Sequence, residues 1–183
     1  MEKLRYSVSY SPLCVVSIVW FAEAENPKII RVFLSGDAAE ARKEIKKIFP
    51  EAKKGKNRKA ELILMAMVSC IKGNAAHLGL DAVQKYASSG FQVAVARAAK
   101  RIPCGKVATY RDIARYLKIK SARAVGSALA RNPFPILIPC HRVVRSDMTI
   151  GGFQAGAGLK KRLLESEGVR FDEKGRIFKE FFI

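Results

Sequence analysis

The chain has 183 residues and a formal net charge of +18, because 34 Lys and Arg side chains face 16 Asp and Glu side chains. Its apolar content of 49% can fill the core of one large or two small domains, which excludes a disordered, collagen-like or disulfide-scaffold protein. Such a cation surplus indicates a polyanionic partner, either a nucleic acid or an anionic membrane surface. Residues 1–89 carry +6 and residues 90–183 carry +12, so the second half is the better candidate for the polyanion surface.

The first half is predicted to be a small α/β unit. Its β-branched and aromatic runs predict strands at Tyr6–Tyr10, Val15–Phe21 and Ile29–Leu34. Lys3 and Arg5 before an apolar run also resemble a secretory signal, but we favour a buried strand for that run. No apolar stretch approaches the roughly 20 residues that span a bilayer, so we expect a cytoplasmic protein without a membrane partner.

Two helices are predicted to follow these strands. Asp37 can cap a helix that runs to about Phe49, where Pro50 stops it, and a second, apolar helix covers Ala60–Ile71. Between the helices lies a run of cations, which we interpret as a solvated loop: Lys53, Lys54, Lys56, Arg58 and Lys59. None of these segments carries recognisable chemistry.

Metal binding has little support in the sequence. The four cysteines (Cys14, Cys70, Cys104 and Cys140) show no C-x-x-C spacing, and only His77 and His141 accompany them. We therefore expect no metal and no cofactor, and reduced thiols, although a disulfide among Cys14, Cys70 and Cys104 stays open.

The second half contains three predicted helices with polar N-caps. Ser89 with Gln92 is a candidate capping box for a helix to about Arg101. Thr109 and Ser121 cap the next two, Tyr110–Leu117 and Ala122–Ala130, and a turn of about four residues between them is the layout of a helix-turn-helix.

The last of these helices has little side-chain bulk. It contains Ala122, Ala124, Gly126, Ser127 and Ala128. Small residues at helical spacing favour either close packing against another element or close approach to a narrow surface such as the minor groove, about 6 Å wide. In the second case Arg123, in the first turn, would point toward the duplex.

The segment Asn132–Val144 is the most distinctive part of the chain. Three prolines (Pro133, Pro135 and Pro139) are expected to keep it straight and out of a helix. Cys140 would then end a rigid, strand-like run beside His141, which favours a reactive thiol linked to the histidine through a water molecule. The alternative is a buried structural cysteine beside a surface histidine.

Pro139-Cys140-His141-Arg142-Val143 resembles the active-site signature of the O6-alkylguanine-DNA alkyltransferases. The resemblance continues in four further motifs: 102–110, 122–126, Gly151-Gly152-Phe153 and 163–168. It implies an α+β protein in which residues 1–86 form an α/β roll, ribonuclease H-like, and residues 87–183 form a mostly helical, winged-helix-like domain with the helix-turn-helix.

The resemblance also implies roles for individual residues in catalysis. Cys140 would accept the alkyl group as a thioether, His141 would act as a water-linked base and Glu167 would orient it. Asn132 would brace the segment before Cys140. Tyr110 would donate a proton or hydrogen bond to the departing guanine, whose developing negative charge needs a placed donor.

The same resemblance implies how base and DNA are held. The pocket would be formed by Tyr110, Leu129, Val143, Phe153 and Gln154. DNA would contact Arg111, Ala122, Arg123, Ala124, Gly126 and Ser146, with Arg123 filling the place of a flipped nucleotide. The sequence departs from the family at Phe153-Gln154-Ala155-Gly156, where the family often has tyrosine and a further glycine, so pocket width is expected to differ.

These implications predict direct reversal of DNA alkylation. A monomer would bind double-stranded DNA containing O6-alkylguanine, and also O4-alkylthymine, and transfer the alkyl group irreversibly to Cys140 in a single turnover. One alternative is a non-catalytic lesion sensor of the alkyltransferase-like kind, which lacks the nucleophile that Cys140 provides. Another is a conventional Cys-His hydrolase, which leaves the thin helix and Arg123 unexplained.

Overall fold

The computed structural model describes residues 3–22, 27–74 and 90–183. The chain divides into two compact units: unit 1 is Met1–Ala87 with Pro133–Leu137, and unit 2 is Ser88–Asn132 with Ile138–Ile183. The boundary predicted between residues 86 and 87 lies outside the described residues, as do His77 and the Ser89 cap. In the described part of the chain no helix is long and apolar enough to cross a membrane.

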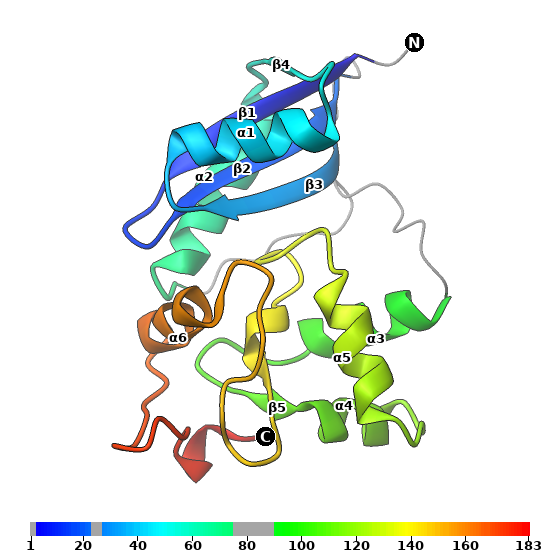
Figure 1. The fold of residues 1–183 in the computed structure, drawn as a ribbon, viewed down its shortest axis with the longest axis vertical. Helices are drawn as coiled ribbons and strands as arrows, with labels where there is room; N and C mark the ends of the chain where they lie inside the picture. Colours follow the sequence, from blue (N-terminus) through cyan, green and yellow to red (C-terminus); the bar gives the residue numbers. More distant parts are fainter. Residues whose placement is uncertain (1–2, 23–26, 75–89) are drawn as a thin grey trace. The chain divides into compact units, whose positions relative to one another are not determined.

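Unit 1 is built on a four-stranded sheet of order β3-β2-β1-β4 (Figure 1). The strands are β1 (Leu4–Tyr10), β2 (Val15–Phe21), β3 (Lys28–Ser35) and β4 (Lys53–Lys54). The three strands predicted from the sequence are confirmed. Both neighbours of β2 pair with it in antiparallel fashion, and all its residues from Val15 to Trp20 are buried, as expected for a central strand covered on both faces.

Two helices, α1 (Ala38–Ile48) and α2 (Arg58–Ile71), cover opposite faces of this sheet (Figure 1). Asp37 caps α1 as predicted, by accepting hydrogen bonds from the amides of Ala39 and Glu40. The solvated loop predicted for the cation run is wrong in part. Lys53 and Lys54 pair with β1, and Arg58 begins α2. Asn57 is the N-cap of this helix, which the interpretation of the cation run as a loop did not take into account.

Unit 2 is mostly helical, which makes the whole chain a mixed α+β protein. Its elements are α3 (Gly90–Lys100), α4 (Tyr110–Tyr116), α5 (Ala122–Ala130), α6 (Ala157–Ser166) and two short parallel strands, β5 (Ala108–Thr109) and β6 (Val143–Val144). The predicted caps are confirmed: Thr109 and Asp112 form a capping box at α4, and Ser121 caps α5. Thr109 is thus both the end of a strand and the cap that sets the start of the helix bearing Tyr110.

The proline-rich segment between α5 and β6 is not straight, so that expectation is wrong. Ile136 has φ of +72° inside a turn, and Cys140–Arg142 form a short 3₁₀ helix directly after Pro139. Prolines exclude α-helix, but they forbid neither a left-handed residue after a proline nor a tight turn that begins at one. Pro133–Leu137 belong to unit 1, where the carbonyl of Pro133 accepts a hydrogen bond from Val32 of β3.

The C-terminal residues complete the core behind the short strands of unit 2. Ile177 is buried with Val107, Val144, Leu164 and Val169. Phe182 lies beside Val107 as an isolated parallel bridge, and the Val107 amide donates to the carbonyl of Phe181. The segment leading into Tyr110 is therefore held on one side by β6 and on the other by the end of the chain.

Candidate active site

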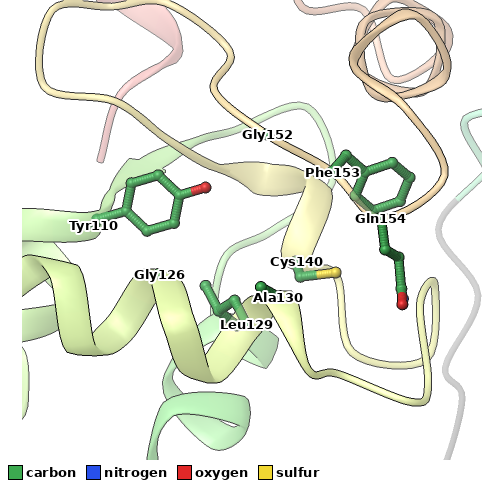
Figure 2. Close-up of a pocket in the computed structure, with 8 residues that line it drawn as sticks. All are labelled: Tyr110, Gly126, Leu129, Ala130, Cys140, Gly152, Phe153 and Gln154. Carbon is green, nitrogen blue, oxygen red and sulfur yellow. The ribbon is translucent and has the colours of Figure 1, made fainter.

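A pocket of about 290 Å³ lies in unit 2, with the thiol of Cys140 in its wall (Figure 2). Its lining comes from α4, α5, the 3₁₀ helix and the loop before α6: Tyr110, Gly126, Leu129, Ala130, Cys140, Gly152, Phe153 and Gln154. In Figure 2 the rings of Tyr110 and Phe153 lie on either side of Cys140. The volume approaches the lower end of the range typical of small-molecule sites, about 300 Å³.

Cys140 carries a buried free thiol held by an amide. Nδ2 of Asn132 lies 3.2 Å from Sγ of Cys140 and donates also to the carbonyl of Ile138, at 3.1 Å. Gln154 in turn donates to the carbonyl of Asn132 at 2.9 Å, which links the pocket wall to the end of α5. Burial raises the pKa of the Cys140 thiol, while the Asn132 hydrogen bond and the charge of Lys160 oppose that rise.

A buried histidine and carboxylate lie next to this thiol. Nε2 of His141 is 2.9 Å from Oε1 of Glu167, and the guanidinium of Arg142 binds both oxygens of the same carboxylate at 2.8 to 3.1 Å. Burial alone would raise the pKa of Glu167, but the hydrogen bonds and charges of His141 and Arg142 lower it to about 2. Glu167 is therefore an anion at neutral pH, locked between an imidazole and a guanidinium.

His141 is set up as a neutral base. Burial lowers its pKa, and its contacts with Glu167 only partly offset this effect. With Nε2 directed at Glu167, the other nitrogen, Nδ1, is buried without a protein hydrogen-bond partner among the described residues. Because the carboxylate fixes the proton on Nε2, the lone pair of Nδ1 is the position that can accept a proton.

A lysine that the sequence did not single out lies behind the pocket. Lys160 of α6 is fully buried, and its Nζ donates to the carbonyls of Val143 at 2.6 Å and Gly152 at 3.2 Å. Its ammonium is also 5.9 Å from the ring centre of Tyr110. Burial lowers the pKa of Lys160 to about 8, while the nearby Cys140 opposes the drop. A buried cation thus joins β6 to the loop that lines the pocket.

The residues predicted to contact DNA lie mainly on the surface of the helix-turn-helix. Arg111 and Arg123 are exposed, as is Ser146 after β6. In α5 the bulkier Val125 and Leu129 are buried, whereas Ala122, Ala124 and Gly126 are half-buried. Close packing therefore accounts for Ala128, which is buried, but leaves the other small residues partly open to solvent.

The structure brings most of the predicted site residues together. Tyr110, Leu129, Phe153 and Gln154 line the same pocket as Cys140. Arg142 and Lys160 were missed as parts of the site. Arg142 lay inside the Pro139–Val143 motif, which was a signal that could have been used. Lys160 is one of two adjacent lysines, and only its helical position, one turn before Leu163 and Leu164, distinguishes it from the exposed Lys161.

Comparison with known proteins identifies unit 2. Residues 90–169 match the family model described as the 6-O-methylguanine DNA methyltransferase DNA-binding domain. A methylated-DNA–protein-cysteine methyltransferase of Methanothermobacter thermautotrophicus is 54% identical over 71 residues, 39% of this chain and 40% of its own length. One from Saccharolobus islandicus is 49% identical over 83 residues, 45% and 54% of the two chains. The chain thus spans about half the length of these curated relatives.

Solved structures extend the likeness to most of the chain. The O6-methylguanine-DNA methyltransferase of Pyrococcus kodakaraensis superposes with a TM-score of 0.71 at 28% identity, covering 91% of this chain and 99% of that one. Mycobacterium tuberculosis OGT in complex with DNA gives 0.67 at 23% identity, covering 89% and 92%, and shares the fold. Residues 90–169 of this chain thus match the DNA-binding domain of the 6-O-methylguanine DNA methyltransferase family.

Proposed function

We propose that this protein repairs O6-alkylguanine in duplex DNA by moving the alkyl group to Cys140. The observation that carries the proposal is the free thiol of Cys140 in a base-sized pocket, beside a buried His141–Glu167 pair. Sγ would attack the alkyl carbon, the bond from that carbon to O6 would break, and the thioether would remain on the protein. Since the geometry offers nothing to cleave a thioether, each molecule would act once.

The thiol needs a base, because burial keeps its pKa high. Neutral His141 is that base: Nδ1 accepts the thiol proton through a water molecule, and the carboxylate of Glu167 stabilises the imidazolium that forms. Asn132 and the charge of Lys160 then stabilise the thiolate. Transfer is expected to fail in acid once His141 is protonated, at a pH below its ordinary pKa of 6.5.

The flipped base would lie between Tyr110 and Phe153. The carbonyl of Val143, held by Lys160, and the amide of Gln154 would read the base edge, and Leu129 would form the apolar floor. As the alkyl group leaves, negative charge develops on guanine. Tyr110 would meet it with its phenolic proton, which burial keeps in place by raising its pKa.

DNA would approach through α5 in the minor groove. The small residues Ala122, Ala124 and Gly126 allow close approach, and the exposed Arg123 would occupy the space of the flipped nucleotide. Arg111 and Ser146 would contact phosphates. The excess of cations after residue 90 suits this mode of binding, since phosphate contacts are independent of base sequence.

Two finer features of the fold belong to the same proposal. Unit 1 would be a ribonuclease H-like roll, and unit 2 a winged-helix-like domain whose two-stranded β5–β6 sheet accompanies the helix-turn-helix. The protein would act as a monomer in the cytoplasm and use O4-alkylthymine as a second substrate.

Mass spectrometry tests the transfer directly. The protein is incubated with a duplex that carries one O6-methylguanine, and intact and peptide masses are measured. We expect one added methyl group on the peptide with Cys140 and none in Cys140→Ala. An unchanged mass despite tight lesion binding would refute transfer and support the non-catalytic sensor.

Arg123→Ala tests the approach of DNA. Repair in duplex should fall strongly, while the reaction with free O6-benzylguanine, which needs no base flipping, should change little. Arg115→Ala is a matched control, because it removes an exposed arginine from α4 that is paired with Asp112 instead of directed at DNA. Equal losses on both substrates would refute the role of Arg123.

A further inference from the structure

Arg145 and the hydroxyl of Tyr110 both approach Gly151, which precedes the pocket residue Gly152. A side-chain carbon added at Gly151 would lie 3.2 Å from Cγ of Arg145, 3.6 Å from its Nε and 3.5 Å from Oη of Tyr110. Gly151 has φ of +69°, a conformation that favours glycine. Because glycine has no side chain, the side chains of Arg145 and Tyr110 can both approach this position. The guanidinium stem and the phenol therefore converge over the same glycine.

Arg145 is not paired with a carboxylate within the described residues. The arginine is exposed and forms no ion pair there, and its backbone amide is used in the turn to Thr149. Asp147 interacts electrostatically with Arg145 but forms no ion pair with it, and Oδ1 of Asp147 accepts hydrogen bonds from the amide and the hydroxyl of Thr149. A cation with no carboxylate bound to it is thus held near a buried phenol.

Three charged or titratable groups act on Tyr110 from three elements. Burial has the largest effect and raises the pKa of Tyr110, the negative charge of the Cys140 thiolate raises it further, and the positive charge of Arg145 lowers it. Lys160 of α6 places its ammonium over the ring. On the α5 side the ring of Tyr110 lies next to Gly126. Among these groups, Cys140 changes charge during alkyl transfer, while Arg145 keeps its charge.

We propose that Arg145 is a positioning residue for alkyl transfer, which stabilises the phenolate left when Tyr110 gives its proton to the departing guanine. The inference rests on the proposed function. The bond between Sγ and the alkyl carbon forms, the O6–carbon bond breaks with its electrons on guanine, and the proton of Tyr110 moves to the base. Because the thiolate has become a neutral thioether, it no longer opposes phenolate formation, and the positive charge of Arg145 remains. Solvent later returns the proton to Tyr110.

The decisive experiment is a double-mutant cycle on free O6-benzylguanine, which has no phosphate for Arg145 to bind. Rates of alkylation of Cys140 are measured for the unaltered protein, Arg145→Ala, Tyr110→Phe and the double variant. We expect Arg145→Ala to slow transfer about three- to fivefold, the scale of an exposed charge, and to have no further effect in Tyr110→Phe. Arg145→Lys should restore most of the rate, and Arg115→Ala should match the unaltered protein.

The pH dependence of the transfer rate is a second test, because a purely structural role of Arg145 would leave it unchanged. Transfer should decline at alkaline pH as Tyr110 ionises, because a phenolate cannot donate a proton. Since Arg145 lowers the pKa of Tyr110, its removal should raise that pKa and shift the decline to higher pH. Phenolate absorbance, taken as the difference between each protein and its Tyr110→Phe counterpart, should shift in the same direction.

Three outcomes would overturn the role of Arg145. The first is that the losses of transfer rate add in the double variant, and the second is that the alkaline decline stays at the same pH in Arg145→Ala. The third is a loss of rate that occurs only with duplex substrate and disappears at high salt, which would make Arg145 a phosphate contact. Failure of the proposed function looks different. In that case the unaltered protein would acquire no alkyl group at Cys140 from either substrate, and the role of Arg145 would fall with it.

Discussion

The two units differ in what they bury. Among the described residues of unit 1, the buried polar side chains are the hydroxyls of Ser7, Ser17 and Ser35, set in an apolar core. Unit 2 buries His141 and Lys160 together with Asn132, and a nearly inaccessible Glu167 side chain accompanies them. Burying ionisable groups is costly unless each one is paired. Unit 2 therefore depends on the pairing of its buried ionisable groups, whereas the core of unit 1 is mainly apolar.

This contrast shows that the two units use their buried interiors for different ends. Removing a methyl group from the core of unit 1 should affect stability alone. Removing a charge from unit 2 should affect stability and chemistry together, since each buried charge there supports a group of the pocket. Four substitution experiments can break or sharpen the comparison.

The largest effect is expected for Glu167→Gln. It leaves His141 without its anion and Arg142 without its carboxylate, so unfolding free energy should fall by about 3–5 kcal/mol and alkyl transfer by at least about tenfold. Glu165→Gln, in the last turn of α6, is the control, because Glu165 is half exposed and its ion pair with Lys161 is long, at 3.8 Å. Urea unfolding and transfer rates measure both effects. If Glu167→Gln were as stable and as active as Glu165→Gln, the contrast between the buried groups of the two units would be refuted.

Ile45→Ala in unit 1 should be nearly as destabilising but chemically silent. Ile45 is fully buried among Tyr6, Val19 and Phe33, and the truncation should lower unfolding free energy by about 2–5 kcal/mol through the cavity it leaves. Under conditions where the variant is fully folded, alkyl transfer should keep its rate. A slower transfer there would mean that unit 1 also tunes the site.

Lys160→Met should give a smaller loss with a pH signature. The buried carbonyl of Val143 and the partly buried carbonyl of Gly152 lose their donor, at a cost of about 1–3 kcal/mol near neutral pH. In the native protein the pKa of Lys160 is lowered from 10.5 to about 8, so the unfolded state binds more protons between these values and stability should rise with pH across that window. Urea unfolding at several pH values should show this rise vanish in Lys160→Met and persist in Lys161→Met.

The smallest effects are expected for a matched pair of helix caps. Asp37→Ala and Ser121→Ala each remove hydrogen bonds to the first turn, of α1 and α5 respectively, and should each cost about 1 kcal/mol. Only Ser121→Ala should also slow duplex repair, since α5 is the proposed DNA contact. If both variants repaired duplex DNA at equal rates, repair would not depend on the capped first turn of α5.

Much of the fold could be predicted because its signals are local. The strand runs at Val15–Phe21 and Ile29–Leu34, and the caps at Asp37, Thr109 and Ser121, act within a few residues and appear where they were expected. The interpretation of the cation run as a solvated loop was wrong in part because Asn57 acts as an N-cap only if a helix follows it. The straight course of the proline segment was wrong for a related reason: the φ of +72° at Ile136 occurs in a stretch that packs in unit 1.

The sequence by itself determined the three long strands, most of the helices, the higher positive charge of the second half and the Cys140–His141 motif, because periodicity, capping and motif order are written along the chain. Only the tertiary structure decided which charges are buried. Lys160 and Lys161 are neighbours in sequence, yet one holds the carbonyls of Val143 and Gly152 while the other is half exposed. Arg145 likewise gained its place beside Tyr110 from a loop that turns at Gly151. Burial depends on contacts between distant residues, and the electrostatics that prepare the thiol and the phenol depend on burial.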